Sequence, residues 1–269
     1  MKKCFKTSIT WLIGILSFLF LFLSDDMFKL VKLIHNQNEA LNVFVNKVLF
    51  AIIVFLVITL ITFVIYKNQN SVIIRGRNYI IEVKFGDIFQ QKTSKKVIPF
   101  DECFTSVVGD EPHNINTNSL CGQFLRFNTS IQIEQLLSKV DSYKKGKSEY
   151  MGLDRYETGR LIPMGDYLLM SFARLNKDGL GCLTFSEYLT GLSVLWDEID
   201  KYYGQEDVCI PILGSGVTRF KDVDLEKQEL LDIIIASYKV SRNKIHRPNK
   251  LIIVCPKNAI SMDKIGENY

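Results

Sequence analysis

The sequence predicts a chain of α/β class, in which a three-layer α/β/α domain follows a hairpin of two membrane-spanning helices. Long uncharged segments gather near the amino end, from Ile9 to Leu23 and from Val48 to Tyr66. Further along the chain, short apolar runs alternate with helix-patterned segments, which is typical of a sheet covered by helices on both faces. We therefore place the hairpin at 1–67, a linker at 68–78 and a ligand-binding domain at 79–269.

The two expected spans cover about residues 7–24 and 48–66. A membrane helix needs about 20 apolar residues, with about 17 as the lower limit. The second segment meets this length by itself, whereas the first reaches it only by including Thr7 and Ser8 or by continuing through Ser24. A signal peptide remains the alternative for the first segment, because lysines precede its apolar run. A buried core helix remains the alternative for the second segment.

The charges that flank the spans predict their orientation. Lysines precede the first span, and Lys67, Arg75 and Arg77 follow the second. Because cationic flanks stay in the cytoplasm, we expect a two-pass protein with both termini and the soluble domain on the cytoplasmic side. The net charge of +4 is too small to indicate nucleic-acid binding. The six cysteines and three histidines show no metal-ligand spacing, so we expect free thiols and no metal.

Carboxylates follow the first two predicted strands of the domain. The strand from Tyr79 to Phe85 leads into Gly86, Asp87 and Ile88, and the strand from Val97 to Phe100 leads into Asp101 and Glu102. Open α/β sheets bind ligands at the carboxyl ends of their strands. Both groups of residues are therefore candidates for a binding site.

The middle of the chain supplies the covering layers. Apolar spacing predicts a helix from Ile131 to Tyr143, and the composition of Tyr167 to Ala173 predicts a buried strand. The basic run from Lys144 to Lys147 is interpreted as a solvated loop, with a contact to anionic lipid as the alternative. Thr184 begins a capping box for a helix in which Trp196 is expected in the core.

The stretch from Val208 to Phe220 is the strongest candidate for a ligand-binding loop. An apolar strand breaks into Gly214, Ser215 and Gly216, and a helix from about Leu225 to Val240 follows. Two glycines around a serine let backbone amides turn together toward an anion such as a phosphate. An ordinary tight turn remains the alternative. Position 219 is Arg instead of a third glycine, and no Gly-Lys-Ser/Thr follows, which excludes the common dinucleotide and P-loop motifs.

These motifs together resemble the macro domain, a fold that binds ADP-ribose and its derivatives. The resemblance rests on Gly86-Asp87-Ile88 after one strand and Gly214-Ser215-Gly216-Val217 after a later one. The wider pattern is similar to the macro domains of Thoeris anti-phage effectors, in which two transmembrane helices precede the domain. The segments that carry this wider pattern are Val97–Phe104, Asn118–Phe124 and Ile210–Gly216.

The resemblance implies a function. A TIR-domain partner would make an ADP-ribose-derived signal, with a histidine-linked form among the candidates, and no cofactor is implied. The effector would sit in the bacterial inner membrane, bind the signal, form a homo-oligomer and disrupt the membrane lipid. The residues that the resemblance and the loop chemistry assign to the ligand are Asp87, Ile88, Asp101, Ser119, Leu120, Gly214, Ser215, Gly216, Val217, Thr218 and Arg219.

Each assigned group has an expected role. Asp87 would accept from the adenine amino group and Ile88 would cover the ring edge, while the amides from Ser215 to Thr218 would hold the diphosphate. Asp101 and Ser119 are expected to reach the distal ribose or its substituent. For Arg219, a contact with phosphate and an ordinary surface position both remain open.

Two other functions remain open at the level of sequence. Macro domains that hydrolyse ADP-ribosyl bonds commonly carry asparagines after the second core strand, where this chain has Phe100, Asp101 and Glu102. A membrane-bound ADP-ribosyl hydrolase with Asp101 or Glu102 as base is one alternative to a sensor without enzyme activity. The other alternative is a structural membrane protein in which Gly214 to Gly216 form only a turn.

Overall fold

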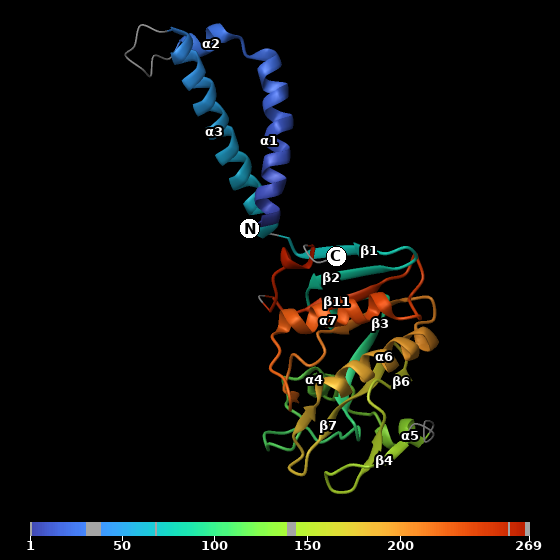
Figure 1. Ribbon diagram of the computed structural model, residues 1–269. Helices are drawn as coiled ribbons and strands as arrows, with labels where there is room; N and C mark the ends of the chain where they lie inside the picture. The colour runs from blue at the N-terminus through green and yellow to red at the C-terminus, as the bar shows by residue number, and fades with distance from the viewer. Residues whose placement is uncertain (1, 31–38, 68, 139–143, 258, 267–269) are drawn as a thin grey trace. The chain divides into compact units, whose positions relative to one another are not determined.

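The computed structural model describes residues 2–30, 39–67, 69–138, 144–257 and 259–266. Its internal contacts divide the chain into two units. One unit comprises Met1–Asn70 and Met262–Tyr269, and the other comprises Ser71–Ser261 (Figure 1).

The first unit contains two long helices, α1 (Lys2–Phe22) and α3 (Glu39–Lys67), and the short α2 (Asp25–Lys29). Within its described residues, one stretch, Glu39–Ile65, is long and apolar enough to cross a membrane, with a hydropathy of 3.3 and 11% of its most apolar window buried. The apolar stretch Thr7–Phe22 is shorter. The second expected span thus meets the length criterion, and the first does not.

Side-chain contacts join α2 to α3. The side-chain amide of Asn46 donates to the Phe28 carbonyl at 2.7 Å, and the Phe28 and Phe50 rings meet edge to face at 5.8 Å. Lys47 pairs with Asp25 at 2.6 Å. These contacts therefore fix the short helix α2 against α3.

The second unit is built on a mixed sheet in the order β1-β2-β11-β9-β3-β7-β8-β10, with β6 also paired to β7. The strands β2, β11, β9, β3 and β7 run parallel to their neighbours in that order. The antiparallel pairs are β1 with β2, β6 with β7 and β7 with β8. The strand bounds are β1 Ser71–Arg75, β2 Ile80–Phe85, β3 Ser94–Asp101, β6 Leu161–Met164, β7 Tyr167–Leu175, β8 Gly181–Leu183, β9 Asp207–Pro211, β10 Arg219–Phe220 and β11 Leu251–Cys255.

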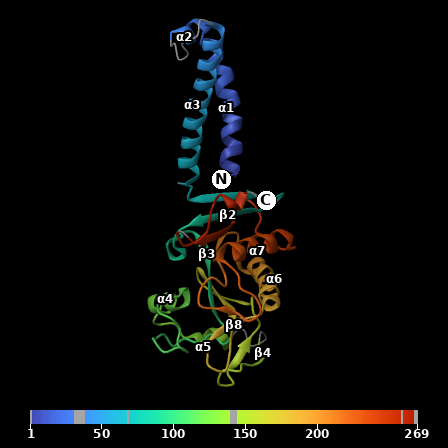
Figure 2. The same ribbon diagram turned by 60° about the vertical axis from the view of Figure 1, so that its left-hand side comes forward.

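Helices cover both faces of this sheet. Helices α6 (Phe185–Tyr202) and α7 (Lys227–Val240) pack together on one side, and α4 (Leu120–Phe127) lies on the other (Figure 2). The short α5 (Ile133–Ser138) and the 3-10 turn η1 (Ile88–Gln90) complete the α4 side. The observed mixed α/β architecture with helices on both faces agrees with the expected layers.

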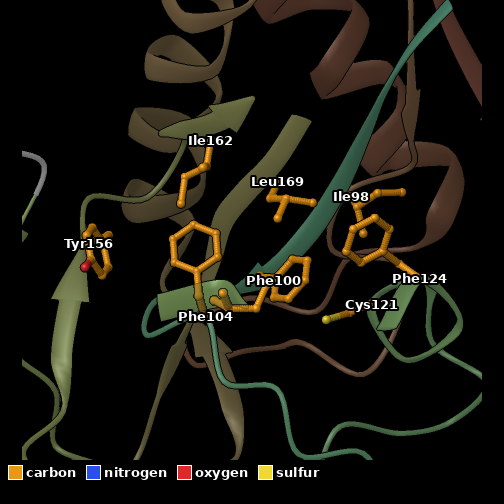
Figure 3. Close-up of a cluster of buried hydrophobic side chains, with 9 residues drawn as sticks. Ile98, Phe100, Phe104, Cys121, Phe124, Tyr156, Ile162 and Leu169 are labelled. Carbon is orange, nitrogen blue, oxygen red and sulfur yellow. The ribbon is translucent and has the colours of Figure 1, made fainter. Parts of the chain in front are cut away.

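The core on the α4 side is aromatic. Figure 3 shows the Phe100, Phe104 and Phe124 rings close together beside Tyr156. The Phe100 ring meets Phe124 edge to face at 5.9 Å, and Phe104 meets Tyr156 in the same way at 5.5 Å. Because Phe100 and Phe104 flank the end of β3, this cluster fixes the turn after the strand.

The core on the α6 and α7 side confirms two expectations from sequence. Thr184 and Glu187 form the capping box at the start of α6. Trp196 is 1% exposed, packs against Tyr238 and donates from its indole to the Ser237 hydroxyl at 3.1 Å. The five cysteines whose side chains the structure describes are buried free thiols.

Two segments differ from the sequence prediction. Strand β1 lies inside the expected linker at 68–78, because its β-branched Val-Ile-Ile run pairs antiparallel with β2. The basic run Lys144–Lys147 is an exposed strand, β4, which pairs with β5 (Asp154–Tyr156) instead of forming a loop. Of the expected helix 131–143, residues 133–138 form α5, and 139–143 lie outside the described residues.

Candidate functional site

The candidate site lies at the carboxyl edge of the parallel strands. Because β2, β11, β9 and β3 are parallel, the residues that follow β2, β9 and β3 emerge at the same edge. The first of these segments contains Asp87 and the second contains Gly214, while Asp101 is the last residue of β3, directly before the third. The topology thus brings together three regions that are far apart in the sequence.

The loop after β9 presents unused backbone donors. Gly214 has a φ of +82°, which turns the chain away from the strand. Ser215 closes this turn, since its amide donates to the Ile212 carbonyl at 3.3 Å and its hydroxyl donates to the same oxygen at 2.6 Å. Within the described part of the chain, the amides of Gly216, Val217 and Thr218 make no hydrogen bond to protein. Three successive free amides can hold an anionic oxygen.

Space around this loop is open at one glycine and closed at the other. A Cβ at Gly216 would meet no atom within 4 Å, whereas a Cβ at Gly214 would lie 3.2 Å from the Phe220 ring. Val217 is 68% exposed. The segment from Gly216 to Thr218 is therefore accessible to a ligand, while Gly214 and Ser215 build the turn that presents it.

The segment after β2 contains an exposed acidic residue, Asp87, followed by a buried apolar residue, Ile88. The Asp87 carboxylate caps η1 by accepting from the Phe89 amide at 2.9 Å, and the residue remains exposed. Its second oxygen has no protein partner among the described residues and can accept from a ligand amine. Ile88 is only 2% exposed and packs on Cys209 and Val254. The Ile88 side chain thus lies inside the core of this structure, and its expected contact with the adenine edge stays a prediction.

The start of α4 joins the same region. Leu120 packs on the cluster that contains Ile88. Ser119 is the N-cap of α4, where its hydroxyl donates to the Asn116 carbonyl at 2.7 Å and accepts from the Gly122 amide at 3.0 Å. The Ser119 side chain therefore positions the helix end in this structure instead of reaching outward.

Asp101 is turned into its own loop. Its carboxylate accepts from the Cys103 amide at 2.8 Å and from the Thr105 hydroxyl at 2.5 Å, and both oxygens accept from the Thr105 amide at 3.2 Å. Burial raises the pKa of Asp101, and these hydrogen bonds oppose that shift. The expected reach toward a distal ribose is absent from this geometry, because both oxygens are engaged within the turn.

Glu102, the next residue, is buried. It is 2% exposed and accepts from the Ser148 hydroxyl at 2.5 Å and the Leu175 amide at 3.3 Å. Arg174 lies 3.6 Å and Arg155 3.9 Å from its second oxygen. This carboxylate compensates two cations and ties the β4–β5 hairpin to β7, which is a structural role.

Two exposed basic residues come shortly after the strands β9 and β11, which end at the carboxyl edge of the sheet. Arg219, expected at a loop end, instead begins β10, which pairs in parallel with β8, and its side chain is exposed. Lys257, which sequence reasoning missed, follows β11 and is exposed. The Gly86 amide donates to the Cys255 carbonyl at 3.0 Å, so the end of β11 lies beside the Asp87 segment. An apolar strand followed by Pro256 was the available signal, but only the strand order places it between β2 and β9.

Comparisons with known proteins identify the family of this chain. Residues 81–256 match the family model described as Thoeris protein ThsA, Macro domain. The chain is 30% identical over 213 residues to the Thoeris protein ThsA of Bacillus amyloliquefaciens (strain Y2), covering 76% of this chain and 71% of that protein.

Two solved macrodomain structures also align with the chain, both with TM-scores below 0.5. A point mutant of an Oceanobacillus iheyensis macrodomain aligns with a TM-score of 0.48 and 11% identity, covering 75% of this chain and 97% of that chain. The macrodomain of Thermus aquaticus DarG aligns with a TM-score of 0.40 and 12% identity, covering 66% of this chain and 97% of that chain. The extent of the family match and the identity to a curated member together establish that the chain belongs to the Thoeris ThsA macro-domain family.

Proposed function

We propose that this protein is a membrane-anchored sensor and effector in anti-phage defence, and that its macro domain binds an ADP-ribose-derived signal. The observation that carries the proposal is the loop after β9, where Gly216, Val217 and Thr218 present free amides beside the exposed Asp87 segment. Amides in succession suit a diphosphate, and a carboxylate oxygen suits an adenine amino group.

Within this proposal the site residues divide into two groups. Asp87 and the amides of residues 216–218 contact the ligand directly, with Arg219 and Lys257 as nearby cations. Gly214, Ser215, Ile88, Leu120, Ser119 and Asp101 hold these groups in place through the turn, core and capping contacts described above.

Ligand binding is coupled to an effect on the membrane. A TIR-domain partner makes the signal, which is ADP-ribose or a histidine-linked form of it. Binding favours an assembled state, and α1 and α3 then disturb the membrane in which they sit, with the macro domain in the cytoplasm. A ligand shifts an equilibrium only when it binds one state more tightly than the other. The ligand must therefore bind the assembled form more tightly.

The binding step is tested by titrating the detergent-solubilised full chain with ADP-ribose in a calorimeter. Gly216→Val fills the open space at the loop and should weaken binding. Ser193→Val adds the same side chain at an exposed position on α6, on the other face of the sheet, and should leave binding unchanged. Equal affinities for the wild-type chain and Gly216→Val would contradict the assignment of this loop.

The assembly and signal steps need separate measurements. Light scattering during the same titration should show a rise in mass, and a constant mass at saturation would remove assembly from the proposal. Mass spectrometry of small molecules that co-purify with the chain from infected cells should find an ADP-ribose derivative. Its fragmentation would show whether histidine is attached.

A hydrolase is the second candidate function, and the state of its carboxylates supports a binding protein instead. A general base must reach the proton that it removes. Both carboxylate oxygens of Asp101 and one of Glu102 already accept hydrogen bonds from the protein. Glu102 is also buried, and Arg174 lies close to its second oxygen. Release of free ADP-ribose from a modified substrate, lost on Asp101→Asn, would favour the enzyme.

A further inference from the structure

Four cations gather at the amino edge of the sheet, opposite the candidate site. Arg75 ends β1 and Arg77 lies in the turn to β2, while Lys244 and Arg247 lie in the loop that leads from α7 to β11. Strands β1 and β2 and the adjacent β11 are visible at one side of the domain in Figure 1. We call these four residues the basic patch.

Direct contacts hold the two segments of the basic patch together. The Arg247 guanidinium donates to the Gly76 carbonyl at 2.6 Å, and Gly76 lies between Arg75 and Arg77. The Asn78 side-chain amide and the His246 ring nitrogen Nδ1 are 2.7 Å apart. The cations of the β1–β2 turn and of the loop before β11 therefore form one surface.

Lys244 is seated on aromatic rings of the same junction. Its ammonium group lies 5.4 Å from the centre of the Tyr79 ring and 5.9 Å from that of Tyr238. It also donates to the Ser241 carbonyl. Burial lowers the pKa of Lys244.

The basic patch lacks the counter-charges that other cations of the domain have. Lys144 and Lys147 lie within 3.2 Å and 2.6 Å of Asp154, and Lys250 pairs with Glu82. Across the described ranges, none of the four patch cations has a carboxylate within ion-pair distance. Uncompensated cations on one surface favour an anionic partner.

The chain itself limits how far this surface can lie from the first unit. Helix α3 ends at Lys67, and Arg77 follows ten residues later. An extended chain spans at most roughly 3.6 Å per residue, so a ten-residue connection reaches at most about 36 Å. If α3 spans a bilayer, the patch is within reach of the headgroups on that side.

We propose that the basic patch docks the macro domain onto anionic phospholipid headgroups. The inference rests on the proposed membrane anchorage through α3. Basic clusters close to the end of a membrane helix are attracted to the negative cytoplasmic leaflet, and salt screens that attraction. Because β2 and β11 begin at the patch and end at the candidate site, docking leaves the ligand edge directed away from the membrane.

The test uses the full chain reconstituted into vesicles and measures tryptic cleavage after Arg75 and Arg77. Vesicles of phosphatidylcholine alone are compared with vesicles that also contain phosphatidylglycerol. In the anionic vesicles we expect cleavage at these two sites to be at least about threefold slower, with the difference lost in about 1 M salt. Lys177, exposed in the β7–β8 turn at the other edge, is the internal control and should be cut equally fast in both.

A matched pair of variants tests the charge of the patch. Arg75→Gln removes one patch cation and keeps the Arg77 cleavage site, so the protection at Arg77 should decrease. Lys227→Gln makes the same charge change at the exposed start of α7 and should leave the protection intact. An equal loss of protection in both variants would overturn a role for the patch.

The outcomes distinguish the docking proposal from the anchorage on which it rests. Release of the chain from vesicles by alkaline carbonate would refute the anchorage. If the chain stays in the vesicles but is cut after Arg77 equally fast with and without phosphatidylglycerol, the docking proposal is refuted and the anchorage stands. Equal protection of Lys177 and Arg77 would indicate general shielding and would also refute the docking surface.

Discussion

The turns after β9 and β3 lie at the same edge of the sheet but use their polar groups in opposite ways. After β9, the amides of Gly216, Val217 and Thr218 have no hydrogen bond within the part of the chain that the structure describes. After β3, the Asp101 carboxylate accepts three donors from its own turn. The β9 loop therefore keeps amide donors that a ligand can use, whereas both Asp101 oxygens of the β3 turn already accept hydrogen bonds.

Position at a ligand-binding edge does not by itself make a residue part of the site. Both turns contain residues typical of binding sites, and both follow buried strands. The difference is whether the local backbone satisfies the polar groups, because a hydrogen bond already made inside the fold must be broken before a ligand can use it. Four experiments test this contrast.

The most destabilising change should be the loss of the β3 turn. Asp101→Ala leaves the Cys103 and Thr105 donors without their acceptor, which should cost about 2–3 kcal/mol of unfolding free energy. For a unit of this size that lowers the Tm by roughly 5–10 °C. Calorimetry or near-UV circular dichroism on the solubilised chain measures the shift. Asp101→Asn keeps one acceptor and should lose about half as much; an unchanged Tm in the alanine variant would show that the turn is not stabilising.

A smaller loss is expected from the residue that builds the β9 turn. Gly214→Val forces a β-branched residue to a φ of +82° and brings its Cβ to 3.2 Å from the Phe220 ring. The strain should cost about 2 kcal/mol, or roughly 4–8 °C in Tm. Gly214→Ala should show a smaller decrease of the same sign. A stable Gly214→Val protein would mean that this turn adapts without its glycine.

A change at the open glycine should separate binding from stability. Gly216→Val has room for its side chain, so its Tm should stay within about 1 °C of the wild type. Its affinity for ADP-ribose should fall about tenfold, equivalent to about 1.4 kcal/mol. A drop in Tm comparable to that of Gly214→Val would show that the two glycines serve the same structural purpose.

The weakest of the four effects is the pH dependence of stability. Because burial raises the folded pKa of Asp101 above its ordinary value of 3.8, the folded state binds more protons than the unfolded state in the window just above pH 3.8. This carboxyl therefore stabilises the fold most below that window, and its contribution declines as pH rises through the folded pKa. Subtracting the pH profile of Asp101→Asn from that of the wild type should isolate a decline with rising pH. A difference of the opposite sign would mean that the turn hydrogen bonds outweigh burial.

Much of the domain could be predicted because its signals are local. The capping box at Thr184 needs only residues of one helix turn, and the burial of Trp196 follows from its place in an apolar helix face. The strands Ile80–Phe85, Ser94–Asp101 and Asp207–Pro211 follow from short apolar or alternating runs. By contrast, β1 was missed because its short Val-Ile-Ile run lies between polar and basic residues, and β4 was missed because it consists of lysines and one glycine. Neither segment gave a clear strand pattern until its partner strand was known.

Sequence alone predicted the α/β class, the apolar span at about residues 48–66, and the loops around Asp87 and Gly214 on which the resemblance to macro domains rests. Folding then decides which candidate side chains remain available. Whether Asp101, Ser119 and Ile88 face a ligand or the protein depends on donors and apolar partners brought together by the fold, including distant strands. A sequence records that a residue can make a hydrogen bond, but only the folded chain determines whether that bond has already been made.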